Sequence, residues 1–344
     1  MSAMLLRQER ADLPFIEQMV DPSAYYIGID IGGTKTAVIL GAVVDDEITV
    51  LQKARFDTDK SGWEPNLEAM RDGVDQVLRL QQLAPSDVAA IGVSCGGPLD
   101  SDRGLIQSPP NLPLWDDVPI CDLLRDAYGV PCFLQNDANA CALAEWKFGA
   151  GQGTRNMVFL TFGTGFGAGL ILDGKLYAGT NGNAGEVGHV RLAEFGPTGY
   201  GKIGSWEGFC SGSGIAQLGR TIVTEEFQNG RSVGFCASAQ DIPQLNAKII
   251  GDAADAGDPV AQRIYALSGR YLGKGLAMMI DFLNPQAIVI GSIFARSGQW
   301  LWPAAQQVIE REALGVAREV CRVVPAALGE SIGDIAALAV ACSM

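Results

Sequence analysis

A pattern of strand, glycine-rich turn and strand occurs twice in this chain of 344 residues. The first copy contains Asp30-Ile31-Gly32-Gly33-Thr34, and the second contains Thr161-Phe162-Gly163-Thr164-Gly165, 131 positions further on (161 minus 30). Ala37 matches Ala168 at the same offset, and apolar runs flank both turns. An internal repeat usually marks a repeated structural unit. We therefore predict two similar α/β domains that face each other, each contributing one glycine turn to a shared central cleft.

The first turn, Gly32-Gly33-Thr34-Lys35, has no side-chain bulk at the position where a phosphate would approach. Successive backbone N–H groups can converge on an anion there, and Thr34 and Lys35 add further donors. The turn is not a P-loop, because that motif needs Gly-Lys in sequence and a helix after it. An ordinary tight hairpin is the alternative for either turn alone. Two turns at matching positions favour a two-sided phosphate clamp.

The second turn, Gly163 to Gly169, also fits the spacing of a dinucleotide-binding fingerprint. That fingerprint requires a helix to begin at the turn. Here Leu170, Ile171 and Leu172 lead instead into Asp173-Gly174, which is a hairpin signal. This order argues against a nicotinamide dehydrogenase.

The remaining pattern alternates helices and short buried strands, as in an α/β protein. One example is the apolar stripe of Leu67, Met70 and Val74, which recurs at helical spacing. We expect an irregular segment at residues 99–118. Helices are expected at residues 66–83, 123–128, 138–148, 211–226, 242–256, 259–283, 300–314 and 333–342, and further strands at 88–94, 130–135, 287–291 and 320–325.

Charge and composition exclude several classes of partner. The formal net charge is −14 and no Lys/Arg cluster offsets it, which argues against a nucleic-acid partner. No apolar run reaches the roughly 18 residues of a membrane span. Met1 to Asp21 mixes charged and apolar residues without the apolar core of a signal peptide. The eight cysteines have no C-x-x-C spacing, so we expect reduced thiols and a cytoplasmic location.

Asp137 directly precedes the helix expected from about Ala138, between Asn136 and Asn139. One interpretation is a simple helix cap, for which Asp and Asn are favoured. The other is catalytic: near a helix N-terminus the carboxylate stays ionised. An ionised carboxylate can orient an attacking hydroxyl and accept its proton during phosphoryl transfer.

Glu186 and His189 are three positions apart with a glycine between them, and His189 is the only histidine in the chain. On a loop or short helix both side chains could point toward one polyol. A lone histidine is often structural, and Glu186 and Glu207 could be solvated surface charges. Their glycine-rich surroundings favour a binding site.

Four segments together resemble the ROK (repressor, open reading frame, kinase) family of sugar kinases, in the actin/hexokinase/Hsp70-like superfamily. They are Tyr26–Thr36, Asn136–Ala140, Gly163–Gly169 and Glu186–His189, and the resemblance extends from about residue 25 through nearly the whole chain. It implies two ribonuclease-H-like (actin-like ATPase) domains around a central cleft. Residues 1–135 with the helix at about 330–344 would form the small, sugar-side domain, and 136–329 the large, ATP-side domain.

The resemblance also implies an activity, namely ATP- and Mg²⁺-dependent phosphorylation of a hexose or N-acetylhexosamine hydroxyl, as in glucokinases. N-acetylmannosamine kinase and fructokinase activities are alternatives that share these motifs. Carried over by position, Asp137 is the catalytic base and Asp30 helps to place Mg²⁺. The sugar would be bound by Gly97, Asn111, Asn136, Asp137, Glu186, His189 and Glu207. ATP would be bound by Gly32, Gly33, Thr34, Lys35, Thr164, Gly165 and Gly291.

The chain departs from the family pattern at one place. Many ROK proteins carry C-x-C-G-x-x-G-C-x-E after the histidine, and these cysteines bind a structural zinc. Here the three cysteine positions hold Thr198, Tyr200 and Ser205, while both glycines and Glu207 are kept. Neutral hydroxyls are poor zinc ligands without thiolates. We predict no zinc, and expect packing around Tyr200 and Trp206 to hold this loop instead.

Two other interpretations remain within this superfamily. A sugar-responsive transcriptional regulator would need a DNA-binding module before Tyr25, where 24 residues are too few for one. A non-catalytic ATPase would not need the Asn136-Asp137 and Glu186/His189 pairs. ROK relatives commonly dimerise, so the resemblance implies a homodimer.

Overall fold

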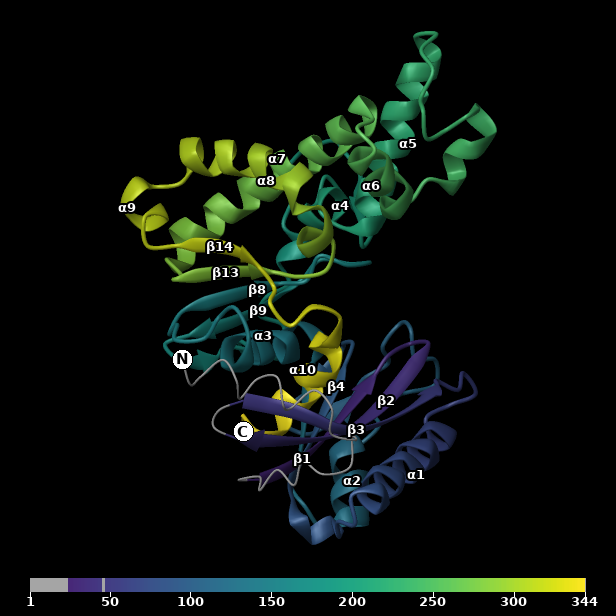
Figure 1. Ribbon diagram of the computed structural model, residues 1–344, viewed down its shortest axis with the longest axis vertical. Helices are drawn as coiled ribbons and strands as arrows, with labels where there is room; N and C mark the ends of the chain where they lie inside the picture. The colour runs from purple at the N-terminus through teal and green to yellow at the C-terminus, as the bar shows by residue number, and fades with distance from the viewer. Residues whose placement is uncertain (1–23, 45–46, 344) are drawn as a thin grey trace, which may run out of the picture.

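The computed structural model describes residues 24–44 and 47–343. The expectation that Met1 to Asp21 contains no signal peptide therefore lies outside the described residues. Two five-stranded sheets follow one another along the long axis of the molecule, each covered by helices on its outer side (Figure 1).

The first sheet has the strand order β3-β2-β1-β4-β7. Its first three strands form an antiparallel meander, and β4 and β7 run parallel to β1. The strands are β1 (Ala24–Ile31), β2 (Lys35–Val44), β3 (Glu47–Asp57), β4 (Val88–Cys95) and β7 (Cys132–Asn136). Helix α1 (Glu64–Leu80) covers the outer face with the predicted stripe of Leu67, Met70 and Val74, which is buried. Helix α2 (Ile120–Tyr128) packs beside β7.

The second sheet repeats this arrangement with the order β10-β9-β8-β13-β14. Three antiparallel strands are again followed by two strands parallel to the meander's inner strand. The predicted duplication is thus confirmed, and the strand after the second glycine turn excludes a dinucleotide-binding turn. The strands are β8 (Met157–Leu160), β9 (Ala168–Leu172), β10 (Lys175–Leu176), β13 (Ala287–Ile290) and β14 (Arg322–Pro325).

Helices above the second sheet build the outer end of the molecule (Figure 1). The longest, α7, begins at Pro259 after the cap residue Asp258, whose side chain accepts the N–H groups of Val260 and Ala261. These helices are α4 (Trp206–Phe209), α5 (Gly212–Gln228), α6 (Ala247–Asp255), α7 (Pro259–Leu283), α8 (Ile293–Glu312) and α9 (Gly315–Arg318).

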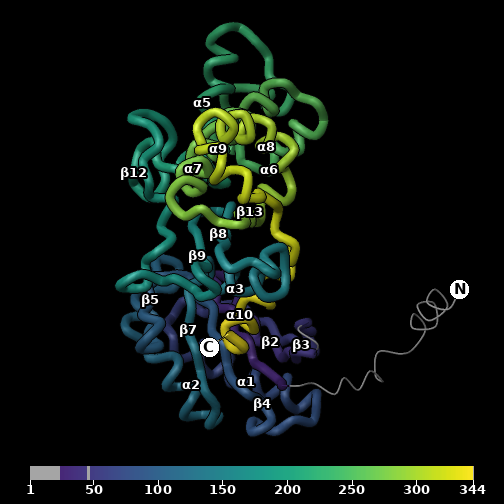
Figure 2. Tube along the Cα trace, turned by 90° about the vertical axis from the view of Figure 1, so that its left-hand side faces the viewer, coloured from purple at the N-terminus to yellow at the C-terminus, as the bar shows by residue number. Residues whose placement is uncertain are grey.

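Two helices lie between the sheets and contact each other (Figures 1 and 2). Helix α10 (Ile332–Ala341) packs on β1 and β4, and helix α3 (Asp137–Phe148) packs on β8 and β9. Glycines allow this closeness: a Cβ on Gly92 would collide with the backbone of α10, and one on Gly169 would lie 2.5 Å from the Ala138 carbonyl oxygen. Both helices are therefore shared between the two halves.

Three sequence predictions of secondary structure differ from the structure. The helix expected at 300–314 begins at Ile293, because Ile293 and Phe294 are buried in the core that flanks β13. The helix expected at 242–256 is divided into a 3-10 helix (Ala239–Gln244) and α6, since Pro243 and the cap residue Asn246 interrupt it. The irregular segment contains a small hairpin, β5 (Leu99–Asp100) with β6 (Leu105–Ile106).

Among the described helices, none combines the length and apolarity that crossing a membrane requires.

Replacing Gly92 by alanine should lower the free energy of unfolding by about 1–3 kcal/mol, because the new methyl group overpacks the contact between β4 and α10. Urea denaturation measures this change. Gly315→Ala is the matched control, since a Cβ there meets nothing within 4 Å. Equal stability of the two variants would contradict this account of α10.

Candidate active site

The first glycine turn closes the β1–β2 hairpin and is held by residues that follow β3. The Thr58 hydroxyl donates to the Gly32 carbonyl at 2.7 Å, and the Thr58 N–H donates to the Thr34 carbonyl at 2.9 Å. Lys60 donates to the carbonyls of Gly33 and Asn111. The absence of a side chain at Gly33 brings Asn111 within 2.8 Å of the position a Cβ would occupy. The turn is thus fixed, and predicted sugar-site residue Asn111 lies against a predicted phosphate-site residue.

The second glycine turn lies where two long helices begin. The Gly212 N–H, at the start of α5, donates to the Gly163 carbonyl at 2.8 Å. The Ile293 N–H, at the start of α8, donates to the Phe162 carbonyl at 2.9 Å. Gly291 directly follows β13 and is buried, and its N–H donates to the Leu160 carbonyl at 3.0 Å. Helix N-termini favour anions, so this turn suits phosphate groups.

Asp137 is the first residue of α3, and its neighbour Asn136 caps the helix by accepting the Asn139 N–H at 2.9 Å. One Asp137 carboxylate oxygen accepts the Ala138 N–H at 2.8 Å. Because Asn136 is the capping residue, the cap interpretation of Asp137 is not needed to explain the helix. Asp137 is exposed to solvent at the start of α3. Desolvation by the surrounding protein raises the pKa of its carboxyl, while N–H donors of Ala138 and of Asp137 itself oppose the rise.

Asp30, at the end of β1, shares the electrostatic environment of Asp137. Burial, then the negative charges of Asp334 and Asp137, raises the pKa of Asp30 to about 6, against the lowering effect of Lys53 and Arg55. Asp334 lies in the first turn of α10, held by Lys53 at 2.7 Å, and a Cβ on Gly333 would be 3.0 Å from the Asp30 carboxylate. The negative charges of Asp334 and Asp137 therefore make the ionised form of Asp30 less favourable.

Glu186 directly precedes a 3-10 turn (Val187–His189) that ends at His189 and packs on the second glycine turn. A Cβ on Gly188 would collide with the Phe166 carbonyl, so only glycine permits this contact. Burial raises the pKa of Glu186, the charges of Asp137 and Glu207 raise it further, and His189 lowers it. Four of the predicted site residues are therefore close enough to interact electrostatically, namely Asp137, Glu186, His189 and Glu207.

Glu207 joins this group to the second glycine turn. Its carboxylate accepts the Phe166 N–H at 3.0 Å and would lie 3.1 Å from a Cβ on Gly165. Asp137 is close to both turns, since its charge raises the pKa of Asp30 beside the first turn, and its neighbour Ala138 would lie 4.0 Å from a Cβ on Gly167 in the second. Gly97 follows β4, next to Gly96, where a Cβ would lie 3.9 Å from the Asn111 amide. Thr34, Lys35 and Thr164 are exposed at the two turns.

Several neighbours of the site were missed by the sequence predictions. Asp334, Thr58 and Lys60 had no motif to single them out, and they reach the site only through the folded topology. Ser211 caps α5 by accepting the Gly214 N–H, and serine before a helix was the available signal. Ser292, with φ +51°, lies opposite Gly163 and marks the start of α8.

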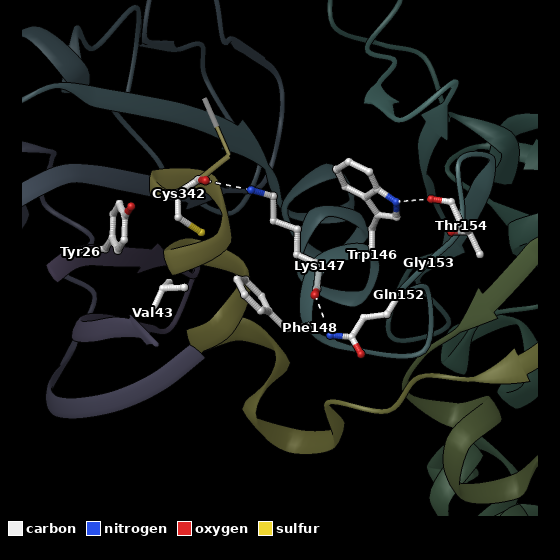
Figure 3. A pocket seen from close by; sticks show the side chains of 9 residues that line it. All are labelled: Tyr26, Val43, Trp146, Lys147, Phe148, Gln152, Gly153, Thr154 and Cys342. Carbon is white, nitrogen blue, oxygen red and sulfur yellow. Dashed lines mark hydrogen bonds between the residues drawn. The ribbon is translucent and has the colours of Figure 1, made fainter. Parts of the chain in front are cut away.

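A separate groove of about 650 Å³ lies on another side of α3 (Figure 3). The Lys147 ammonium donates to the Cys342 carbonyl and the Trp146 indole to the Thr154 carbonyl along its wall. None of the predicted site residues lines it. The groove is lined by Tyr26, Val43, Trp146, Lys147, Phe148, Gln152, Gly153, Thr154 and Cys342.

The sequence predicts that packing around Tyr200 and Trp206 holds the loop in which Thr198, Tyr200 and Ser205 replace cysteines. The structure agrees for Trp206 and differs for Tyr200. Trp206 is buried and packs on Phe166 with ring centroids 4.9 Å apart, as expected. Tyr200 does not pack there, because its side chain is 80% exposed at the tip of a turn with φ +43°. In residues 24–44 and 47–343, no cluster of three His, Cys, Asp or Glu side chains is suited to hold a metal ion.

The repeated sheet, with a shared helix layer and one glycine turn from each half, defines the fold class as two ribonuclease-H-like domains of the actin-like ATPase type. The sequence profile of the ROK family matches residues 26–343. The chain belongs to the ROK family.

Relatives of known sequence include both kinases and regulators. A glucokinase of Halalkalibacterium halodurans is 32% identical over 314 residues, which cover 90% of this chain and 93% of the relative. The DNA-binding transcriptional dual regulator NagC of Escherichia coli is 30% identical over 247 residues, which cover 72% of this chain and 58% of that protein.

Two solved kinase structures share the fold over nearly the whole chain. The ROK hexokinase of Thermus thermophilus has a TM-score of 0.74 and 30% identity, covering 92% of this chain and 97% of that one. The ROK family glucokinase of Streptomyces griseus, solved with glucose and AMPPNP, has a TM-score of 0.71 and 31% identity, covering 92% and 99%.

Asp30→Asn should stabilise the protein at pH 8, by roughly 1–2 kcal/mol, because ionised Asp30 is unfavourable in the folded state. The raised pKa means that stability falls as the pH rises from about 4 toward about 6, and the penalty then persists. Below about pH 4 the stability gained by Asp30→Asn should disappear, because Asp30 is then protonated in the wild type as well. Urea denaturation at pH 4 and pH 8 tests this, with exposed Asp102→Asn as the control. A variant that is less stable than the wild type at pH 8 would contradict the prediction.

Proposed function

We propose that this protein is an ATP-dependent sugar kinase that transfers the γ-phosphoryl group of ATP to a hexose or N-acetylhexosamine hydroxyl. The observation that carries the proposal is the position of Asp137. Its accessible carboxylate lies at the capped start of α3, between Asp30 near one glycine turn and Gly167 in the other. The kinase relatives support the same conclusion.

In this mechanism Asp137 holds the attacking sugar hydroxyl in line and accepts its proton as the oxygen–phosphorus bond forms. A pKa raised by burial suits this role, since a general base works best when its pKa approaches the operating pH. The N–H bond from Ala138 fixes one carboxylate oxygen and leaves the other for the hydroxyl.

We assign sugar binding to the polar groups around Asp137. Glu186, His189 and Glu207 share its electrostatic field, and carboxylates can each accept hydrogen bonds from sugar hydroxyls. Asn136 and Asn111 would supply amide groups to the sugar, and Gly97 would leave space for it. Residues 1–135 with the helix at about 330–344 would form the sugar-side unit, which the contacts of α10 with β1 and β4 support.

ATP phosphates would lie between the glycine turns, contacted by Gly32, Gly33, Thr34 and Lys35 from one side and by Thr164 and Gly165 from the other. The N-termini of α5 and α8 add partial positive charge there. Gly291, at the end of β13, would leave room for the adenosine. Residues 136–329 would form this ATP-side unit.

The donor set also fits a magnesium ion, since Mg²⁺ is commonly held by one or two carboxylates, waters and substrate phosphates. Asp30 would hold it, and its crowding by Asp137 and Asp334 favours a cation there. When bound, the ion would neutralise charge on the transferred phosphoryl group.

Glucose is the substrate we favour, because the glucokinase relatives cover most of the chain. N-acetylmannosamine and fructose are the alternatives. A coupled assay of ADP release over a panel of sugars distinguishes these substrates.

We also propose that the reaction takes place in the cytoplasm, where ATP is available.

The NagC similarity favours one rival, a sugar-sensing regulator. Sugar binding without ADP release across the panel would support this rival and reject the kinase proposal.

Asp137→Asn should abolish nearly all turnover, by about 10²–10⁴-fold, because the amide cannot accept the hydroxyl proton. Sugar binding, measured by calorimetry, should be largely retained since Asn keeps the shape and hydrogen-bonding capacity. Turnover close to that of the wild type would refute Asp137 as the base.

We also propose a homodimer. Large apolar side chains are exposed together where α7 ends and α9 begins, with Leu314 bonded through its N–H to Asp281. Exposed apolar patches of this kind mark interaction surfaces. The patch consists of Phe282, Leu314, Val316 and Val320.

Phe282→Asp combined with Val316→Asp should shift the mass in solution from two chains to one, as measured by light scattering, because buried charge would oppose association. Leu80→Asp, at an exposed site on α1, is the control. A dimer that survives the double substitution would place the interface elsewhere.

A further inference from the structure

The loop after His189 is one where the family often binds zinc, and the residues present here do not fit that metal. The buried Ser205 hydroxyl is used to cap α4, accepting the Gly208 N–H at 3.1 Å. Both backbone groups of Thr198 are bonded to the Gln217 side chain at 2.9 Å. Tyr200 extends into solvent. No thiolate is available, and zinc binds neutral hydroxyls poorly.

Direct hydrogen bonds hold the loop instead. The Leu192 N–H donates to the Gly204 carbonyl and the Trp206 N–H to the Val190 carbonyl, each at 2.8 Å. The Arg191 guanidinium donates to the Ile203 carbonyl at 2.8 Å. The short pair β11 (Thr198–Gly199) and β12 (Lys202–Ile203) forms a hairpin at the end of this ladder. Backbone and side-chain bonds thus join both arms of the loop without a metal.

The tip of this hairpin contacts His189 at two points. The Lys202 ammonium donates to the His189 carbonyl at 2.7 Å. The Tyr200 ring meets the imidazole edge-on, with centroids 6.2 Å apart and an interplanar angle of 74°. Both side chains of the turn, that of Tyr200 and that of Lys202, therefore lie against the same residue.

Freedom from a metal changes what the imidazole can do. A zinc-bound histidine has one ring nitrogen committed to the metal, whereas a free neutral imidazole keeps one donor and one acceptor. His189 could then both donate to and accept from a polyol beside Glu186. This step rests on the proposed function, while the position of His189 does not.

We propose that Tyr200 and Lys202 are positioning residues for His189, and that they replace in this chain a metal ion that would otherwise fix the loop. They act on the imidazole ring and on the His189 backbone respectively, and neither touches the reacting atoms.

The single histidine makes a direct test possible, because ¹³C,¹⁵N-histidine labelling of the full chain, with any histidine tag removed, gives one set of imidazole NMR signals. Tyr200→Leu and Lys202→Met should each shift these signals beyond the spread seen in Tyr177→Leu and Lys175→Met, exposed controls on and beside β10. Unchanged urea midpoints would show that the variants fold. Imidazole signals like those of the wild type in both variants would overturn the proposal.

Zinc itself is the second probe. One equivalent of Zn²⁺, followed by dialysis, should leave the His189 signals unmoved and no zinc in the protein by elemental analysis. One equivalent of retained zinc with shifted imidazole signals would overturn the metal-free part of the proposal.

Kinetics separates this inference from the function on which it rests. With a sugar that the wild type phosphorylates, Lys202→Met should raise the sugar KM by about fivefold, the effect of one net hydrogen bond, while the ATP KM stays unchanged. Equal increases in both KM values would indicate a general structural effect and count against a positioning role. If the wild type phosphorylates no sugar, the proposed function fails, and the NMR and zinc results still decide the position of His189.

Discussion

Helices α3 and α10 have to fit together between two sheets, and the rest of the molecule depends on how they do so. The fit is tight enough that backbone meets backbone, at Gly28 and Gly92 under α10 and at Gly169 under α3. Glu145 secures the arrangement from within α3. Its fully buried carboxylate accepts the N–H groups of Ala150, Ala327 and Leu328, and so joins the end of α3 to the segment that leads into α10. A buried carboxylate is stable only when its oxygens are paired in this way.

This packing fixes the start of both helices, and that is where the acidic groups meet. Asp137 begins α3 and Asp334 lies in the first turn of α10, so both are brought toward Asp30 at the end of β1. Burial of Asp30, and then the like charges of Asp334 and Asp137, cost free energy in the ionised form, which the raised pKa of Asp30 reflects. In the proposed function, a cation that binds together with the anionic substrate would offset this repulsion. The site is therefore less stable alone than a neutral one would be.

Much of this could be predicted from the sequence because the informative residues are adjacent in the chain. The glycine turns, Asn136-Asp137 and Glu186/His189 are local patterns, and the structure brings all of them into one region. Asp334 could not be predicted, since it reaches Asp30 only through the return of α10 to the first sheet. The early start of α8 was missed for a similar reason, because burial beside β13 rather than helical propensity decides where Ile293 lies. Tyr200 was misplaced because an aromatic side chain at a vacated cysteine position suggested packing, whereas its left-handed backbone conformation directs it outward.

The two glycine turns also show how a duplicated fold can become asymmetric. The first turn is held by two side chains from the segment that follows β3, Thr58 and Lys60, which donate to its carbonyl groups. The second is held by the backbone N–H groups of two helices, α5 and α8, whose N-termini converge on it. The same strand–turn–strand unit is thus stabilised by different partners in the two halves. Only the second turn acquires helix dipoles, and only the first lies beside Asp30 and Asn111. The two turns are similar in themselves, and the groups around them differ. The two halves of the molecule therefore present different charges and hydrogen-bonding groups at their turns.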